Sequence, residues 1–146
     1  MSKVIIDLPH QLLKEIVKLW VEKSSDITRV YEEQAIGGRK LDLVGEKMVS
    51  GFDEPLQVFF EIETDVPKST YINEYLEFCK KQRPFEAYLI APTQKIEYRY
   101  WDDERFQYKR TLTIMPFTDV WHEINVFFNV RFEVVKGKVI LLLEEK

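Results

Sequence analysis

The segment 58–91 constrains the fold more than any other part of the chain, because it is predicted to form a strand, a helix and a strand in succession. Residues 58–63 are an apolar run that ends in acids, residues 69–82 carry apolar side chains at helical spacing, and residues 86–91 form a second apolar run. Such a crossover is normally right-handed, and its two strands lie parallel. The sequence therefore predicts an α/β fold.

Further elements are predicted on either side of this segment. Upstream, an amphipathic helix over 9–23 precedes two strands over 28–35 and 39–44, which are joined by a turn at Gly37-Gly38. Downstream, the pattern predicts two strands, a short helix and a hairpin over residues 95–100, 107–115, 119–129 and 131–143. We expect a single domain over residues 1–146, with a core over about 9–92 and a β-rich C-terminal extension over about 93–146.

Three acidic residues lie on two of the predicted strands. Glu61 and Glu63 are two positions apart, so they point to the same face of their strand, and Asp42 joins that face if the two strands pair. Crowded carboxylates repel one another unless a cation lies between them, and oxygen ligands of this kind suit Mg²⁺ or Mn²⁺. The alternative is that these acids are solvated and paired with Lys40, Lys47 or Lys68.

This order of elements and acids resembles the PD-(D/E)xK nuclease superfamily, which has the restriction-endonuclease-like fold. The resemblance covers roughly residues 9–92, with Asp42 as the first acid of the motif and Glu61 as the second. Glu63 stands where the family usually has lysine, so we take Lys68 as the candidate for the missing positive charge, with Lys40 second. The resemblance implies a central mixed sheet flanked by helices and a Mg²⁺-dependent endonuclease.

The chemistry implied by this resemblance is hydrolysis of a phosphodiester bond in nucleic acid, in DNA more than in RNA. Asp42 and Glu61 would hold a metal that polarises the scissile phosphate and lowers the pKa of an attacking water. Glu63 would either complete the metal site or orient that water. The alternative is a catalytically inactive nuclease-like module that binds nucleic acid or a protein partner.

Charge and assembly bear on how such a protein binds its substrate. The chain has 21 Lys and Arg against 25 Asp and Glu, a net charge of −4, so a nucleic-acid surface has to be a local patch or a dimer groove. We expect a homodimer with its apolar seam near Phe127 and Phe128, because cutting both strands of a duplex needs two active sites. The basic residues that could contact phosphates are Arg99, Arg105, Lys109 and Arg110, or else Lys80, Lys81 and Arg83. For the first set, the alternative is that the interleaved aromatic residues pack a sheet and the basic residues are solvated.

The remaining composition argues against several other classes of protein. A single cysteine, Cys79, rules out an internal disulfide and is expected in the core, and two histidines far apart in the sequence give no Cys/His metal motif. The sequence shows neither a signal peptide nor an apolar run long enough to span a bilayer. We therefore expect a soluble, cytoplasmic protein without a membrane partner.

Overall fold

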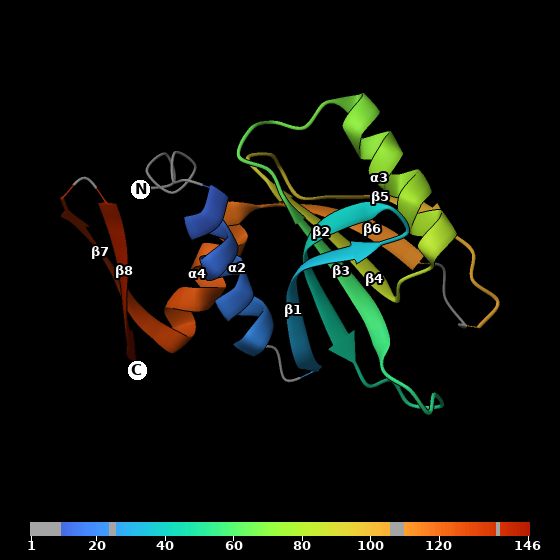
Figure 1. Cartoon of the computed structure of the whole chain (residues 1–146), viewed down its shortest axis with the longest axis horizontal. Coiled ribbons are helices and arrows are strands. Elements are labelled where there is room, and N and C mark those ends of the chain that lie inside the picture. The colour runs from blue at the N-terminus through green and yellow to red at the C-terminus, as the bar shows by residue number, and fades with distance from the viewer. Residues whose placement is uncertain (1–9, 24–25, 106–109, 137) are drawn as a thin grey trace.

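The computed structural model describes residues 10–23, 26–105, 110–136 and 138–146, and for residues 98–100, 132, 135, 138, 139 and 141 it describes the backbone alone. Three helices and eight strands lie within these residues (Figure 1). Their order is α2 (His10–Lys23), β1 (Ile27–Ile36), β2 (Arg39–Lys47), β3 (Leu56–Ile62), α3 (Ser69–Gln82), β4 (Glu86–Ala91), β5 (Ile96–Trp101), β6 (Arg110–Pro116), α4 (Phe117–Phe127), β7 (Phe128–Val135) and β8 (Lys138–Glu145).

Six strands form one mixed sheet in the order β1-β2-β3-β4-β6-β5. β1, β2 and β3 form an antiparallel meander, β4 runs parallel to β3 and to β6, and β5 is antiparallel to β6. The predicted crossover is therefore confirmed, with α3 connecting the parallel strands β3 and β4. The predicted turn between β1 and β2 is also confirmed, and Gly37 and Gly38 adopt the positive φ values of +56° and +82° that a tight hairpin turn requires.

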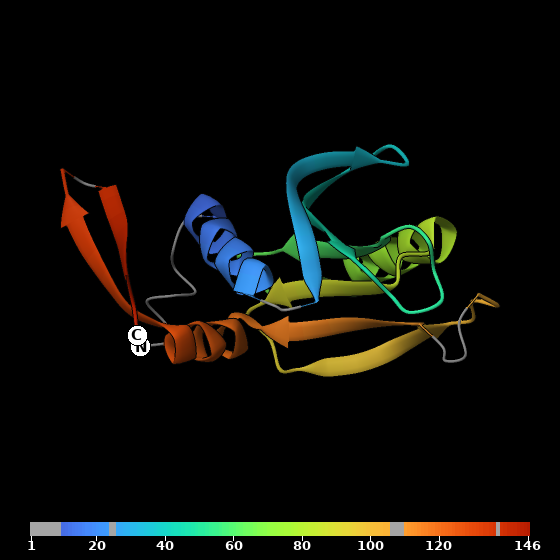
Figure 2. The same cartoon turned by 90° about the horizontal axis from the view of Figure 1, so that it is seen from below.

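Helices cover both faces of this sheet (Figures 1 and 2). α2 and α4 pack on one face, where Phe60 and Ile62 of β3 point into the same core. α3 packs on the other face, where its Tyr75 and Cys79 belong to the same core as Phe59 of β3. Cys79 is fully buried, as predicted, and burial raises the pKa of its thiol to about 12. Alternate residues of β3 thus point into two separate cores, so Glu61 points to the face of the sheet that α3 covers.

The C-terminal third differs from the predicted extension in how it joins the body. β5 and β6 add to the central sheet and α4 packs beside α2, so only β7 and β8 form a separate two-stranded sheet. This hairpin projects from the end of the molecule opposite α3 (Figure 1). The helix predicted from residue 119 begins at Phe117, directly after Pro116 ends β6. Within the described residues, no helix combines the length and the apolar character needed to cross a membrane.

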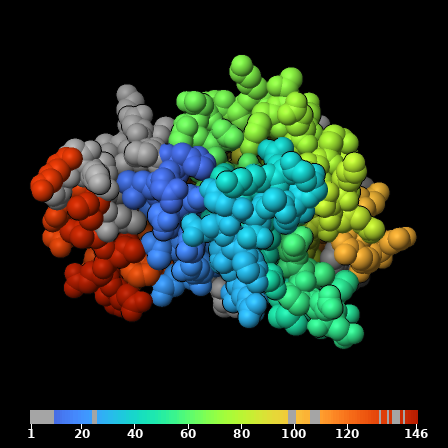
Figure 3. Space-filling model, viewed as in Figure 1, coloured from blue at the N-terminus to red at the C-terminus, as the bar shows by residue number. Residues whose placement is uncertain are grey.

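The β1–β2 hairpin bends away from the sheet and lies along α2 (Figures 2 and 3). β2 pairs with β3 only from Leu43 to Lys47, whereas it pairs with β1 from Arg39 onward. The first residues of β2 therefore leave the plane of β3. The candidate site lies at this point of separation.

Candidate functional site

Asp42 and Glu61 meet where β2 and β3 separate. The last paired residues are Leu43 and Phe60, so Asp42 and Glu61 occupy the next position beyond the ladder. Side chains replace the missing ladder bonds there. The Asp42 amide donates to Glu61 Oε1 at 3.1 Å, and the Ile62 amide donates to Asp42 Oδ2 at 2.8 Å. The structure thus brings the first and second acids of the motif side by side.

Glu61 is held on the α3 side of the sheet, and its side chain is only 9% exposed. The Tyr71 hydroxyl donates to Glu61 Oε2 at 3.0 Å, and the Arg39 guanidinium lies 3.7 Å from the same oxygen. Burial is the main cause that raises the pKa of Glu61 to about 7, and the nearby charge of Asp42 adds to it. Arg39 and Tyr71 oppose this effect only in part. A carboxylic acid that titrates near neutral pH is typical of a functional site.

Arg39 and Tyr71 pack against each other beside Glu61. Arg39 donates to the Tyr71 hydroxyl at 3.0 Å, and its guanidinium carbon lies 5.3 Å from the centre of the Tyr71 ring and 5.0 Å from that of Tyr75. Burial, followed by the charge of Glu61, raises the pKa of Tyr71, so this hydroxyl stays protonated and donates. The orientation of Glu61 is therefore fixed by groups from β2 and α3.

His10 approaches Asp42 from the other side. Its Nε2 lies 3.4 Å from Asp42 Oδ2 and 3.1 Å from the Ile62 carbonyl oxygen. A carboxylate oxygen and a backbone carbonyl oxygen thus converge on one nitrogen atom at the start of α2. Sequence reasoning missed His10 because it looked for a second histidine or cysteine nearby. The sequence does contain a signal for His10, because this residue lies in the first turn of a predicted helix whose apolar face has to pack against the sheet.

Lys14 lies one helical turn beyond His10 and on the same face of α2. Its side chain is only 4% exposed, and its Nζ contacts Glu33 Oε1 at 2.5 Å. This hydrogen bond is the main cause that raises the pKa of Lys14, and the charge of Asp42 contributes, so Lys14 stays positive. Sequence reasoning missed this lysine too, because Lys14 lies in the helix and not in the motif.

Glu33, the partner of Lys14, has an unusual backbone. Its φ of +54° falls in the left-handed region, although its neighbours Glu32 and Gln34 pair regularly with β2. A non-glycine residue in this conformation costs of the order of 1–3 kcal/mol, and such strain persists where the surrounding structure fixes it, often at functional sites. Here the Lys14 ammonium lowers the pKa of Glu33 and keeps it ionised.

Glu63 and the lysines that were predicted to assist are placed differently. Glu63 follows the last residue of β3 and is half-buried. Its charge is a smaller cause of the raised pKa of Tyr71 than burial and the charge of Glu61. Lys68 is exposed at the N-cap position of α3, and Lys40 lies 3.6 Å from Glu33. In the part of the chain that the structure describes, no ion pair joins Lys68 or Lys40 to Asp42 or Glu61.

The donors at this site fit a hard cation by type. Among the described residues no three acidic, histidine or cysteine side chains form a preassembled metal group. Mg²⁺, however, usually keeps several waters and needs only one or two carboxylates from the protein. The Asp42 carboxylate and the Ile62 carbonyl supply such oxygens beside His10 Nε2, and the Glu61 carboxylate accepts from the Asp42 amide.

The predicted nucleic-acid patch is described only in part. Lys109 and the side chain of Arg99 lie outside the described residues. Arg105 binds the Asp103 carboxylate at 2.7 Å and the Arg83 carbonyl oxygen at 2.8 Å. Arg110 is 9% exposed, donates to the Phe85 carbonyl at 3.2 Å and stacks on the Phe85 ring. Both described arginines therefore make internal contacts.

Comparison with models of known families, with curated proteins and with solved structures found no match for this chain.

Proposed function

We propose that this protein is a metal-dependent nuclease that hydrolyses phosphodiester bonds, with DNA favoured over RNA. The observation that carries the proposal is the convergence of Asp42 Oδ2 and the Ile62 carbonyl on one point beside α2, with Glu61 buried next to it. The order of elements adds support, since a helix, a three-stranded meander, a second helix and a parallel strand follow one another in the chain.

Each group of the chain has a definite part in this proposal. Asp42, Glu61 and the Ile62 carbonyl would hold Mg²⁺, which would supply positive charge at the phosphate and lower the pKa of an attacking water. Lys14 keeps a buried positive charge near Asp42, so it is the best-placed substitute for the usual lysine of the motif. Arg39 and Tyr71 orient Glu61, and Glu63 lies near enough to Tyr71 to position a water on that side.

His10 is the residue that has to respond to a cation. Its Nε2 lies within hydrogen-bonding distance of the Ile62 carbonyl oxygen, which is also one of the candidate ligands. His10 either leaves this point when the cation enters or contributes its neutral nitrogen as a ligand.

The second candidate is a nuclease-like module that binds nucleic acid or a protein without cutting. The contacts of the two acids favour it, because Asp42 accepts from the Ile62 amide and Glu61 from the Asp42 amide and the Tyr71 hydroxyl. Carboxylates that are satisfied in this way have less need of a metal. This candidate requires that substitution of either acid leaves nucleic-acid or partner binding intact.

We further propose that the protein acts as a homodimer. β7 and β8 form a two-stranded sheet with exposed apolar residues, and an isolated two-stranded hairpin is marginally stable in water. A second copy would cover this surface and place two sites on one duplex. Phe128, which was predicted for the seam together with Phe127, is instead only 6% exposed and lies in the core. The described residues at this end that are apolar and exposed are Val126, Phe127, Val134, Ile140 and Leu143.

Cleavage assays decide between the two candidates. Supercoiled plasmid, single-stranded DNA and RNA are incubated with the protein in Mg²⁺, Mn²⁺ or a chelator. Metal-dependent cleavage is expected, and Asp42→Asn is expected to reduce the rate at least about a hundredfold, as for loss of a group that stabilises a transition state. Glu77→Gln is the matched control, because Glu77 is 71% exposed on α3. Metal-dependent cleavage that survives Asp42→Asn contradicts this site, and no cleavage of any substrate favours the binding module.

A further inference from the structure

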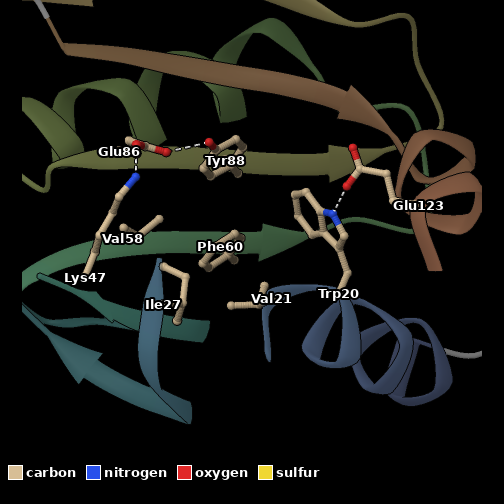
Figure 4. A pocket seen from close by; sticks show the side chains of 9 residues that line it. All are labelled: Trp20, Val21, Ile27, Lys47, Val58, Phe60, Glu86, Tyr88 and Glu123. Atoms are coloured by element: carbon tan, nitrogen blue, oxygen red, sulfur yellow. Dashed lines mark hydrogen bonds and ion pairs between the residues drawn. The ribbon is translucent and has the colours of Figure 1, made fainter. Parts of the chain in front are cut away.

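A cavity lies between α2, α4 and the sheet, and we call it the aromatic pocket (Figure 4). Its volume is about 180 Å³. The residues that line it are Trp20, Val21, Ile27, Lys47, Val58, Phe60, Glu86, Tyr88 and Glu123. Three of these residues are aromatic and three are charged.

The three aromatic rings are held in fixed relative positions. Phe60 and Tyr88 are direct neighbours on the parallel strands β3 and β4, and their rings stack with centroids 5.2 Å apart. Trp20 stands nearly perpendicular to both rings, at 6.1 Å from each. Trp20 Nε1 donates to Glu123, and the Tyr88 hydroxyl donates to Glu86 Oε2 at 2.5 Å, so α4 and β4 fix these orientations (Figure 4).

The charge at the rim of the aromatic pocket is negative. Lys47 lies 3.0 Å from Glu86, so these two charges offset each other. The bond that Glu123 accepts from Trp20 comes from a neutral indole and leaves the negative charge of Glu123 uncompensated by that partner. Burial is the main cause that raises the pKa of Tyr88, and the charges of Glu86, Glu97 and Glu123 each add to it. Among the residues that line the pocket, two glutamates thus stand against the single positive charge of Lys47.

We propose that the aromatic pocket binds a small organic cation with a methylated ammonium group. Such a cation is attracted to the faces of aromatic rings and, unlike an anion, to the glutamates at the rim. The size agrees, since a cavity of about 150 Å³ holds a molecule as large as benzene. A free ligand such as choline and a methylated lysine side chain of another protein present the same group.

This pocket is separate from the proposed nuclease site. Trp20 lies ten residues beyond His10 on α2, which is about 15 Å along the helix axis. Phe60 points to the α2 side of the sheet, whereas the adjacent Glu61 points to the α3 side. Binding in the aromatic pocket uses none of the acids at the other site, so it stands or falls independently of the nuclease proposal.

Calorimetric titration of the full chain tests the proposal with choline and with 3,3-dimethylbutan-1-ol, its neutral isostere. Choline is expected to bind about tenfold more tightly than the isostere, because the shapes match and only the charge differs. Glu123→Gln is expected to weaken choline binding several-fold, and Glu77→Gln is expected to leave it unchanged. Glu123 and Glu77 are both exposed, so both variants should fold.

A second pair of titrations identifies the source of the cation. A peptide with trimethyllysine that binds more tightly than both choline and its unmodified form indicates a methylated protein partner. Choline that binds more tightly than the peptide indicates a free small molecule. Equal affinity for choline and its neutral isostere, or no binding of choline or peptide at millimolar concentration, overturns the proposal.

Discussion

Replacing Glu61 by glutamine should stabilise the metal-free protein at alkaline pH. The pKa of Glu61 rises from 4.5 to about 7 in the folded protein, mainly through burial. At about 1.4 kcal/mol per pH unit, this shift corresponds to about 3 kcal/mol. Because the folded protein holds this proton more tightly than the unfolded chain, stability falls as the pH rises from 4.5 to 7, and the full cost is present above 7.

Glutamine removes the buried charge but keeps most of the shape. Its side-chain oxygen can still accept from the Asp42 amide, while the hydrogen bond from Tyr71 loses its charged acceptor. The pKa of about 7 already includes the hydrogen bond that Tyr71 donates to the charged carboxylate, so this bond is not counted a second time. Because glutamine does not titrate, the difference between Glu61→Gln and wild type should change by about 3 kcal/mol between pH 4.5 and pH 8. The net expectation is a gain in unfolding free energy of about 2 kcal/mol at pH 8, and a loss of about 1 kcal/mol at pH 4.5, where wild-type Glu61 is protonated.

Urea unfolding in a chelator at pH 4.5 and pH 8 measures both values. Glu77→Gln serves as the control, because a substitution at this exposed position should change stability by less than about 0.5 kcal/mol at either pH. A clear loss of stability in Glu61→Gln at pH 8 would refute the reasoning. It would mean that Glu61 serves mainly as the structural partner of Arg39 and Tyr71.

Asp103 is the opposite case, because hydrogen bonds from Arg105 and Arg83 lower its pKa although its side chain is fully buried. Asp103→Asn should lower the unfolding free energy by about 2 kcal/mol at pH 7. In urea unfolding, this difference from wild type should shrink as the pH falls below about 4. An equal loss at pH 3 and pH 7 would argue against a role for the charge of Asp103. Lys14→Met should reduce the rate of cleavage about a hundredfold while circular dichroism shows an intact fold, whereas Lys68→Met should leave the rate unchanged. A loss of cleavage in Lys68→Met but not in Lys14→Met would restore Lys68 as the catalytic lysine. Light scattering should show a dimer that Val134→Lys dissociates, and a wild-type monomer at micromolar concentration would contradict the assembly.

Local patterns were enough to predict the crossover between β3 and β4. The apolar stripe of 69–82 lies between Pro67 and Pro84, and both limits of α3 are confirmed. The strand that follows is also confirmed at 86–91. Signals of this kind are local, because proline and periodicity act over a few residues.

The arrangement of the C-terminal third could not be predicted in the same way. β6 lies between β4 and β5 although β5 comes first in the chain, so sequence order does not give strand order. For the basic residues of this region the sequence left two alternatives open, contact with phosphates or solvated charges beside packed aromatic residues. Arg105 binds Asp103, and Arg110 stacks on Phe85, and the second of these contacts joins distant segments that sequence pattern does not relate.

The same distinction holds within the candidate site. The motif identified Asp42 and Glu61, because alternation along a strand determines which residues share a face. His10 and Lys14 enter the site only because the β1–β2 hairpin bends onto α2, and the strained backbone of Glu33 belongs to the same packing. A one-dimensional pattern does not contain that bend.

Titration of the metal-free protein with Mn²⁺, followed by electron paramagnetic resonance, tests most directly whether Asp42 and Glu61 form a metal site. One Mn²⁺ is expected to bind per chain and to be displaced by excess Mg²⁺. Asp42→Asn is expected to weaken this binding at least about tenfold, since one of only two carboxylate ligands is lost, and Glu77→Gln is expected to bind as the wild type does. No Mn²⁺ binding at millimolar concentration, or equal binding by wild type and Asp42→Asn, would contradict the proposed metal site.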